Sequence, residues 1–249
     1  MAYGETNGAA RRRVVIFDTE TTGRSPADGD RIVEIGCVEL IGYDVGRTFH
    51  AYLNPERDVP EEVVRVHGLT GHFLRDKPLF SSVCEELMTF FGEADAIVAH
   101  NAEFDRGFLN AELERLGLPA LPQTRFIDTL ALARQKLRAG MRLGLDALAK
   151  HYRLDQRGFD LESRRGAGGH GALLDAQMLA EVFIELEGGR EQAFAFAAAE
   201  SAVANGGEGP THVSRPQRPA PAPLLSTPEE RAAHAAFVAG LGAPSLWPA

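Results

Sequence analysis

Two acidic residues stand close together at the end of an apolar run near the N-terminus. In VVIFDTETTG, which spans Val14–Gly23, Asp18 follows four apolar residues and Glu20 comes two positions later. Side chains two positions apart share one face of a strand, so these carboxylates are expected to lie side by side. Close like charges raise each other's pKa unless a cation or a proton lies between them. The stretch therefore predicts a cation site, and a solvated turn with capping residues is the alternative.

Two later motifs add a third and a fourth acidic residue and a histidine. HNAEFD, His100–Asp105, places Asp105 at the start of a helix that directly follows a short buried strand. HGALLD, His170–Asp175, places His170 in a glycine-rich loop and Asp175 beside the apolar stripe of the next helix. Each motif alone also fits helix capping, but an isolated carboxylate at such a position would be costly to bury. We therefore expect these groups to converge where strand ends meet helix starts.

The chemistry of this residue set points to metal-dependent hydrolysis. Four oxygen-donor acids without cysteine suit a hard cation such as Mg²⁺ or Mn²⁺ rather than zinc. Two divalent ions would neutralise the cluster, and a pair of ions is the usual device for in-line displacement at phosphorus. His170 suits a general base, because an ordinary imidazole titrates near pH ~6.5. The predicted metal ligands are Asp18, Glu20, Asp105 and Asp175.

Strands and helices alternate along the first 189 residues in a way that would position these groups. The predicted strands are residues 14–17, 31–42, 48–54, 96–100 and 126–127, with a hairpin connection at 42–46. The predicted helices are residues 59–68, 81–92, 103–117, 128–137, 143–152 and 172–189, the last with one apolar stripe of Leu174, Met178, Val182 and Leu186. This order predicts an α/β domain with a mixed five-stranded sheet flanked by helices.

Composition limits the class of protein. Hydrophobic residues make up 44% of the 249 residues, which is enough to fill a core. The net charge of −9 argues against a nucleic-acid binder that relies on a broad basic surface. Cys37 and Cys84 lie in apolar runs and are predicted to be buried free thiols. Without an apolar run of about 18 residues or a signal peptide, we expect a soluble cytoplasmic protein.

The C-terminal part of the chain has a different composition. We predict a folded α/β domain over residues 1–190, a flexible linker over 191–225 that is rich in Gly and Pro from 205 onward, and a docking segment over 226–249. Thr227, Pro228 and Glu230 form a helix start signal. The short helix that follows would be marginal alone. Its stripe of Ala233, Phe237 and Leu241, with Trp247 beyond it, is therefore expected to dock on a partner.

The three motifs resemble those of a known enzyme family. DTETTG, HNAEFD and HGALLDAQ are similar to the three motifs of the DEDDh, or DnaQ-like, 3′–5′ exonucleases. The resemblance runs from about Arg13 to Gly189. It implies a ribonuclease-H-like fold, two divalent metal ions and release of nucleoside monophosphates from 3′ ends. VHGLT, GLDALAKHY and HGALLDAQMLAEVF further resemble the proofreading exonucleases of bacterial DNA polymerase III.

The resemblance implies further contacts. Glu62 and His67, with Asp18, Glu20 and Asp175, would contact the terminal nucleotide, and Phe104 would either pack against a base or belong to the core. A segment with Gln192, Phe194 and Phe196 occupies the place of a sliding-clamp motif, although phenylalanine stands where an aliphatic residue is common. The terminal SLWPA resembles the segment that binds the polymerase catalytic (α) subunit, with Phe237, Leu241 and Trp247 as docking residues. Some bacteria add a third small core subunit.

Other interpretations remain open at this point. The same motifs fit a DEDDh nuclease that acts on RNA or on repair intermediates. The chain would alternatively serve mainly as a structural partner that stabilises a polymerase. Arg157, Arg164 and Arg165, in the loop before His170, would either contact phosphate or lie on a solvated surface.

Overall fold

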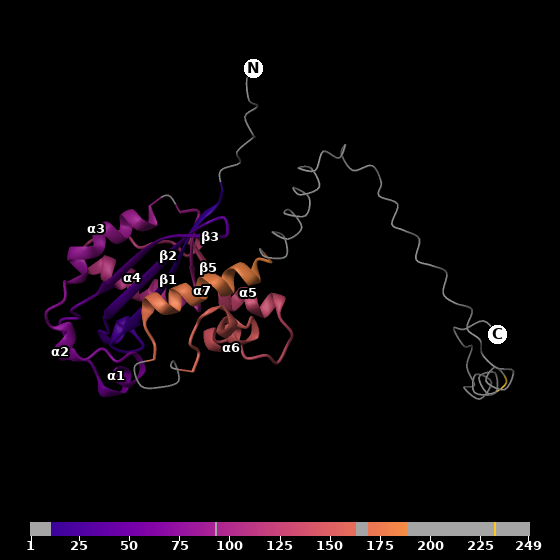
Figure 1. Cartoon of the computed structure of the whole chain (residues 1–249). Helices are drawn as coiled ribbons and strands as arrows, with labels where there is room; N and C mark the ends of the chain where they lie inside the picture. Colours follow the sequence, from indigo (N-terminus) through magenta and orange to yellow (C-terminus); the bar gives the residue numbers. More distant parts are fainter. Residues whose placement is uncertain (1–10, 93, 163–168, 189–231, 233–249) are drawn as a thin grey trace, which may run out of the picture. The chain divides into compact units, whose positions relative to one another are not determined.

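The computed structural model describes residues 11–92, 94–162 and 169–188, together with Ala232. The chain divides into a unit of residues 1–196 and a unit of residues 197–249, and all described residues except Ala232 belong to the first (Figure 1). Apart from Ala232, the predicted linker, clamp segment and docking helix lie outside the described residues. The same holds for the individual positions Arg164, Arg165, Gln192, Phe194, Phe196, Phe237, Leu241 and Trp247.

A five-stranded mixed sheet forms the centre of the first unit. Its strands are β1 (Arg13–Thr21), β2 (Ile32–Ile41), β3 (Asp44–Tyr52), β4 (Ala96–Ala99) and β5 (Phe126–Asp128). The strand order is β3-β2-β1-β4-β5. β1, β2 and β3 pair antiparallel, whereas β4 is parallel to both β1 and β5. This arrangement confirms the predicted mixed sheet, with β1 at its centre.

Seven α-helices surround the sheet within the described residues. They are α1 (Glu61–His67), α2 (Gly71–Leu74), α3 (Phe80–Phe91), α4 (Ala102–Arg115), α5 (Thr129–Lys136), α6 (Leu145–His151) and α7 (Ala172–Leu186). Three 3₁₀ turns, at Pro26–Asp28, Gln123–Arg125 and Leu154–Arg157, complete these elements. All six predicted helices are present. The prediction missed α2, whose four residues are too few to show a period and which begins where the Thr70 side chain accepts a hydrogen bond from the Phe73 amide.

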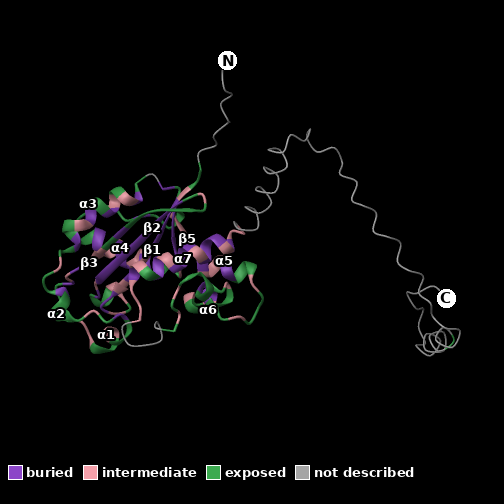
Figure 2. Ribbon diagram, viewed as in Figure 1, coloured by how far each residue is buried: buried purple, intermediate pink, exposed green. Residues whose placement is uncertain are grey.

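Alternate side chains of β1 pack into two separate cores. Val15 and Phe17 join residues of α3 and α4 in one core, whereas Val14 and Ile16 join residues of α7 in another. A third cluster joins α5 and α6 to the outer side of α7. Figure 2 shows the buried strands between these helices. The sheet is therefore a middle layer, with α3 and α4 against one face and α7 against the other.

Three local predictions need correction. β1 continues to Thr21 instead of ending at Phe17, because its polar second half keeps pairing with β2. The hairpin connection is only Gly42–Tyr43, and Gly42 adopts φ 66°, a left-handed conformation that glycine accepts without strain. Leu174 does not belong to the buried stripe of α7, because it is 41% exposed on the first turn of the helix, whereas Met178, Val182 and Leu186 are buried.

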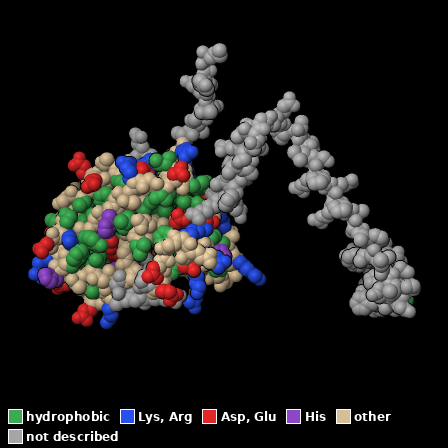
Figure 3. Space-filling view, viewed as in Figure 1, with side chains coloured by type: hydrophobic (Ala, Val, Ile, Leu, Met, Phe, Trp, Pro, Cys, Tyr) green, Lys and Arg blue, Asp and Glu red, His purple; other side chains and the backbone are tan. Residues whose placement is uncertain are grey.

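The prediction of two buried free thiols is confirmed. Cys37 and Cys84 are free and buried. Lys and Arg side chains are scattered over the face shown in Figure 3, and the described residues form no broad basic patch on that face. Among the described residues, no helix is both long enough and apolar enough to span a bilayer.

Candidate active site

β1 presents two acidic side chains to the face covered by α7. Side chains alternate between the two faces of a strand, so Asp18 and Glu20 lie on the same face of β1 as Val14 and Ile16, which pack against α7. In the register between β1 and β2, Asp18 lies opposite Gly36 and Glu20 lies opposite Glu34. The predicted side-by-side pair is therefore present, within a strand and not in a solvated turn.

A glycine on β2 allows α7 to begin directly against the sheet. A Cβ atom on Gly36 would lie only 2.3 Å from the backbone of Ala172, the first residue of α7. No larger residue fits there without a shift of the backbone. The close approach brings the first turn of α7, with Asp175 only 6% exposed, to the face that carries Glu20.

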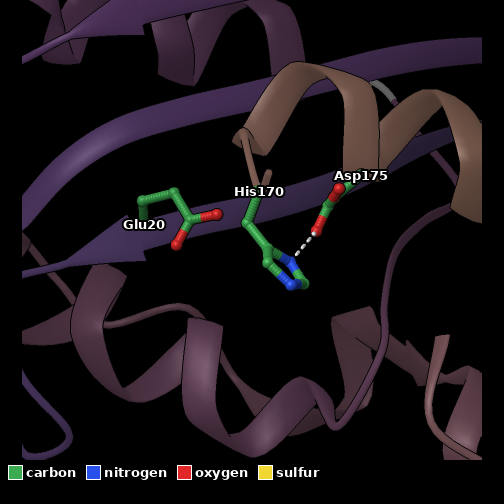
Figure 4. A group of neighbouring side chains, drawn as sticks. All are labelled: Glu20, His170 and Asp175. Carbon is green, nitrogen blue, oxygen red and sulfur yellow. Dashed lines mark hydrogen bonds and ion pairs between the residues drawn. The ribbon is translucent and has the colours of Figure 1, made fainter. Parts of the chain in front are cut away.

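Glu20, His170 and Asp175 form a compact group, although they come from different parts of the sequence. One potential ligand atom from each lies within 4.8 Å of the others. His170 Nδ1 lies 3.2 Å from Asp175 Oδ2, within hydrogen-bond distance. Figure 4 shows the His170 ring between the two carboxylates. The structure thus brings together three of the five residues predicted for catalysis and metal binding.

The electrostatics of Glu20 are those of a carboxylate that needs a cation or a proton. The pKa of Glu20 is raised from 4.5 to about 8, first by burial and then by the nearby charges of Asp175, Glu34 and Asp105, while His170 opposes the rise. A group this strongly perturbed, inside an acidic cluster, is typical of a functional site. The same charges that raise the pKa of Glu20 would favour a divalent cation.

Asp18 lines a cavity with two of the other predicted residues, His170 and Asp175. The cavity has a volume of about 340 Å³ and its wall includes Asp18, His100, Arg142, His170 and Asp175. The remaining lining residues, Gly144, Leu145, Asp146 and Ala147, come from the start of α6 and the position before it. A substrate group that enters this cavity would therefore meet three of the predicted catalytic side chains.

Asp105 approaches from the other side of β1. It is buried on α4, and Thr19 Oγ1 donates a hydrogen bond to its Oδ1 at 2.7 Å. Burial raises its pKa from 3.8 to about 7, while the hydrogen bonds from Thr19 oppose the rise. Asp105 is not part of the 4.8 Å group, yet its charge contributes to the raised pKa of Glu20. The structure therefore places Asp105 beside the group formed by Glu20, His170 and Asp175.

The helix α1 lies next to the loop that carries His170. The His170 amide donates a hydrogen bond to the Val66 carbonyl at 3.4 Å. His67 is 5% exposed, and its Nδ1 accepts a hydrogen bond from the Leu69 amide at 3.0 Å. Burial lowers the pKa of His67, and the main chain at Thr21 opposes this in part. Glu62 is exposed on the same helix.

Two residues from the sequence analysis lie in structural contacts. Phe104 packs with its ring 4.9 Å from that of Phe108, at the edge of the core under α4. Arg157 forms ion pairs with Glu181 and Glu185 of α7, at 3.4 Å and 2.8 Å.

Four further residues near the site were not predicted from the sequence. Glu34 is 3% exposed, and its Oε1 lies 2.7 Å from His50 Nε2. Arg142 and His100 line the cavity with Asp18, and Thr19 holds Asp105. Of these, only Glu34 had a usable signal, because it stands between apolar residues in a strand predicted to be buried. The others depend on tertiary packing.

The residues present fit a hard divalent cation. Asp18, Glu20 and Asp175 offer carboxylate oxygens on one face of the sheet, and no cysteine lies among the groups that line the site. Burial first, and then the charges of Asp175, Glu34 and Asp105, raise the pKa of Glu20, so a cation bound beside it would favour its ionised form.

Comparison with known proteins relates this geometry to a family. The RNase T family model, described as Exonuclease, matches residues 15–183. DNA polymerase III subunit epsilon of Rickettsia conorii is 46% identical over 186 residues, which cover 73% of this chain and 76% of that protein. The subunit of the same name from Escherichia coli K12 is 38% identical over 247 residues, which cover 94% of this chain and 97% of that protein.

Solved structures share the same architecture. Exonuclease X in complex with 5′ overhanging duplex DNA has a TM-score of 0.50 at 28% identity, covering 70% of this chain and 90% of that chain. The nuclease domain of 3′hExo, a DEDDh family member bound to rAMP, has a TM-score of 0.56 at 18% identity, covering 72% of this chain and 92% of that chain. With its motifs, sheet and clustered acidic groups, the chain belongs to the DEDDh, or DnaQ-like, family of 3′–5′ exonucleases, in which it resembles DNA polymerase III subunit epsilon.

Proposed function

We propose that this chain removes mispaired 3′-terminal nucleotides from DNA during replication, as the proofreading subunit of a DNA polymerase III. The observation that carries the proposal is the convergence of Glu20, His170 and Asp175 within 4.8 Å. It is supported by relatives in two bacteria that carry the name DNA polymerase III subunit epsilon. Replication also makes the cytoplasm the site of action.

Acidic side chains would hold two divalent ions, Mg²⁺ or Mn²⁺. The ligands in this proposal are Asp18, Glu20, Asp105 and Asp175. When bound, such ions supply Lewis-acid stabilisation of charge at phosphorus and make water a better nucleophile at neutral pH. The raised pKa of Glu20 supports this assignment, because a carboxylate that would otherwise keep its proton to about pH 8 gains from a cation in the proton's place.

His170 is the general base of the proposal. Its Nδ1 faces Asp175 Oδ2 at 3.2 Å, so the carboxylate orients the ring and favours the tautomer with the proton on Nδ1. The proton of the attacking water is then taken at Nε2. Its position between Glu20 and Asp175 places the ring within the acidic group where the phosphodiester would react (Figure 4).

Glu62 and His67 would contact the terminal nucleotide, together with Asp18, Glu20 and Asp175. The hydrogen bond from the His170 amide to Val66 supports this, because it ties α1 to the catalytic loop. Selection against mispairs need not involve reading of the bases. A mispaired end melts at lower cost and therefore enters a single-strand site more often.

The remainder of the chain would connect the nuclease to its assembly. In this proposal residues 1–190 form the nuclease domain, residues 191–225 a linker with a clamp-binding segment, and residues 226–249 the part that binds the polymerase α subunit. A sliding clamp and a third core subunit are further partners. A short flexible tether commonly gives a millimolar effective concentration at a neighbouring site. A chain without residues 205–249 should therefore still digest short single strands but no longer co-purify with the polymerase.

A labelled-primer assay tests the catalytic proposal. The full-length chain with Mg²⁺ should shorten a 5′-labelled primer one nucleotide at a time, release nucleoside monophosphates and act faster on a mismatched 3′ end. A chelator or the substitution Asp18→Ala should abolish the reaction, whereas Asp28→Asn, which changes an exposed acid outside the site, should not. Activity that survived Asp18→Ala would contradict the assignment. A faster reaction on an RNA strand of the same sequence would favour an RNA substrate.

A further inference from the structure

The loop between α5 and α6 places one arginine in the wall of the catalytic cavity. Arg142 lines the cavity that also contains Asp18, His170 and Asp175. It is the only lysine or arginine among the described residues that line the cavity. The side chain is exposed, and no ion pair joins it to another described residue. A cation without a carboxylate partner among the described residues, in a cavity that also contains three aspartates, is placed to bind an anionic group of a substrate.

A contact beside Arg142 holds one end of this loop near His100. His100 lines the same cavity, and its Nδ1 lies 2.9 Å from Thr129 Oγ1 at the start of α5. Thr129 Oγ1 in turn donates to the Ala99 carbonyl. The main chain at Leu143, next to Arg142, lies close enough to His100 to affect its pKa, which burial lowers overall. Arg142 therefore extends from a backbone that is anchored to the sheet.

The two ends of the site differ in how closed they are. Along β1 the order is Asp18, Glu20 and Thr21, and His67 lies against the main chain of Thr21. Thr21 and His67 are both buried, so packed side chains border this end of the site. At the Asp18 end the cavity is bordered by residues that are exposed, Arg142 among them. An enzyme that starts from a 3′ end needs a closed end for the terminal nucleoside and an open end for the continuing strand.

We propose that Arg142 binds the phosphate on the 5′ side of the scissile phosphate. The inference rests on the proposed function and deepens it, because it assigns a direction to the bound strand. The terminal nucleoside would lie toward Thr21 and His67, and the rest of the strand would leave over Arg142. A guanidinium is suited to this role, because its planar fork of donors matches phosphate oxygens. The contact also offsets the repulsion between an acidic cavity and the strand.

Two substrates that differ upstream of the reacting phosphate test this assignment. One is a single-stranded DNA oligonucleotide, and the other is the p-nitrophenyl ester of thymidine 5′-monophosphate, which has no second phosphate. For the full-length chain with Mg²⁺, Arg142→Gln should lower kcat/KM on the oligonucleotide by ~10-fold or more, as expected for loss of a hydrogen bond to a charged group. On the ester, kcat/KM should change less than about twofold, because the lost contact does not exist there.

Two controls separate a local contact from a general charge effect. Arg138→Gln removes a positive charge from an exposed position in the same loop, outside the cavity, and should leave both substrates unaffected. A methylphosphonate at the second linkage from the 3′ end of the oligonucleotide removes the charge of the phosphate that Arg142 would bind. It should therefore lower the rate at which the unsubstituted protein removes the first nucleotide, and it should change the rate of the Arg142→Gln variant little.

The possible results distinguish this inference from the proposed function. Equal losses on oligonucleotide and ester would overturn the inference and place Arg142 at the scissile phosphate. The inference would also be overturned if Arg142→Gln lowered kcat/KM on the oligonucleotide no more than Arg138→Gln does. In both cases the proposed function would stand. An unsubstituted protein that hydrolysed neither substrate with Mg²⁺ would overturn the proposed function and this inference together.

Discussion

Gly36 on the second strand lies directly against Ala172, the first residue of the last helix of the nuclease unit. A Cβ atom at Gly36 would meet the Ala172 carbonyl oxygen at 2.3 Å. Since Asp175 follows one turn later and Asp18 lies opposite Gly36 in the sheet, this contact sets the distance between strand and helix at the site. The glycine thus connects the packing of the fold to the geometry of the acidic group.

The first prediction concerns this contact. Gly36→Ala forces the start of α7 away from β2, and overpacking of this kind typically costs about 1–3 kcal/mol of unfolding free energy. Because the shift moves Asp175 relative to Glu20, exonuclease activity should fall even under conditions where the protein remains folded. Urea unfolding and the labelled-primer assay measure the two effects.

Gly107→Ala is the matched control for this substitution. Gly107 lies within α4, and a Cβ atom there would meet no atom within 4 Å. Alanine should stabilise the helix by about 0.5–1 kcal/mol and leave activity unchanged. If Gly36→Ala behaved like Gly107→Ala, the close approach of α7 would not control the site.

The second prediction concerns pH. The folded chain keeps a proton on Glu20 to about pH 8, whereas an unperturbed glutamate loses it near 4.5. Between about pH 4.5 and pH 8 the folded state therefore binds more protons than the unfolded state, so the stability of the metal-free protein falls as the pH rises through this range. Asp105, with its pKa raised to about 7, acts in the same direction. Added Mg²⁺ should therefore stabilise the protein more at about pH 8 than at about pH 5.

Urea unfolding with chelator and with Mg²⁺ at both pH values checks this expectation. Glu20→Gln removes the titrating group, so the metal-free protein should show a smaller loss of stability between the two pH values. Glu34→Gln removes one of the charges that raise the pKa of Glu20, and it should have a smaller effect of the same sign. An unchanged dependence on pH in Glu20→Gln would show that Glu20 does not carry the effect.

The third prediction concerns Thr19, whose hydroxyl donates to the buried carboxyl of Asp105. Thr19→Val keeps the shape of the side chain but removes the hydroxyl donor of this buried carboxyl, and loss of such a donor typically costs about 1–3 kcal/mol. Activity should fall with stability, because Asp105 would lose its orientation and the pKa of Asp105 would rise further. Thermal unfolding and primer digestion measure both, with Thr48→Val, at an exposed position of β3, as the control. If Thr19→Val and Thr48→Val had the same thermal stability and the same activity, the hydrogen bond from Thr19 to Asp105 would have no role in either property.

Local sequence patterns were sufficient to predict the sheet and most of the site. Asp18 and Glu20 follow an apolar run, and His170 and Asp175 occur within six residues, and the motifs taken together predicted that these residues share one site. The extent of β1 was not predictable in this way, because its polar end is held by pairing with β2 and not by its own residues. Leu174 was assigned to a buried stripe on periodicity, yet its side chain is 41% exposed on the first turn of α7.

Residues that depend on tertiary contacts were missed. Gly36 had a usable signal, because a glycine inside a predicted strand often marks a close backbone approach. Arg142 had none, since an arginine in an irregular exposed segment carries no period and no motif. Its position in the cavity depends on where the loop between α5 and α6 folds against β4, which no local pattern encodes.

The most direct test of the metal site is a Mn²⁺ titration in which the free ion is followed by electron paramagnetic resonance. The unsubstituted protein should bind Mn²⁺, while Glu20→Gln and Asp175→Asn should each weaken binding by about tenfold or more, because each removes a carboxylate ligand. Asp28→Asn should bind as the unsubstituted protein does. If Glu20→Gln and Asp175→Asn bound the same number of ions with the same affinity, these carboxylates would not hold the metal.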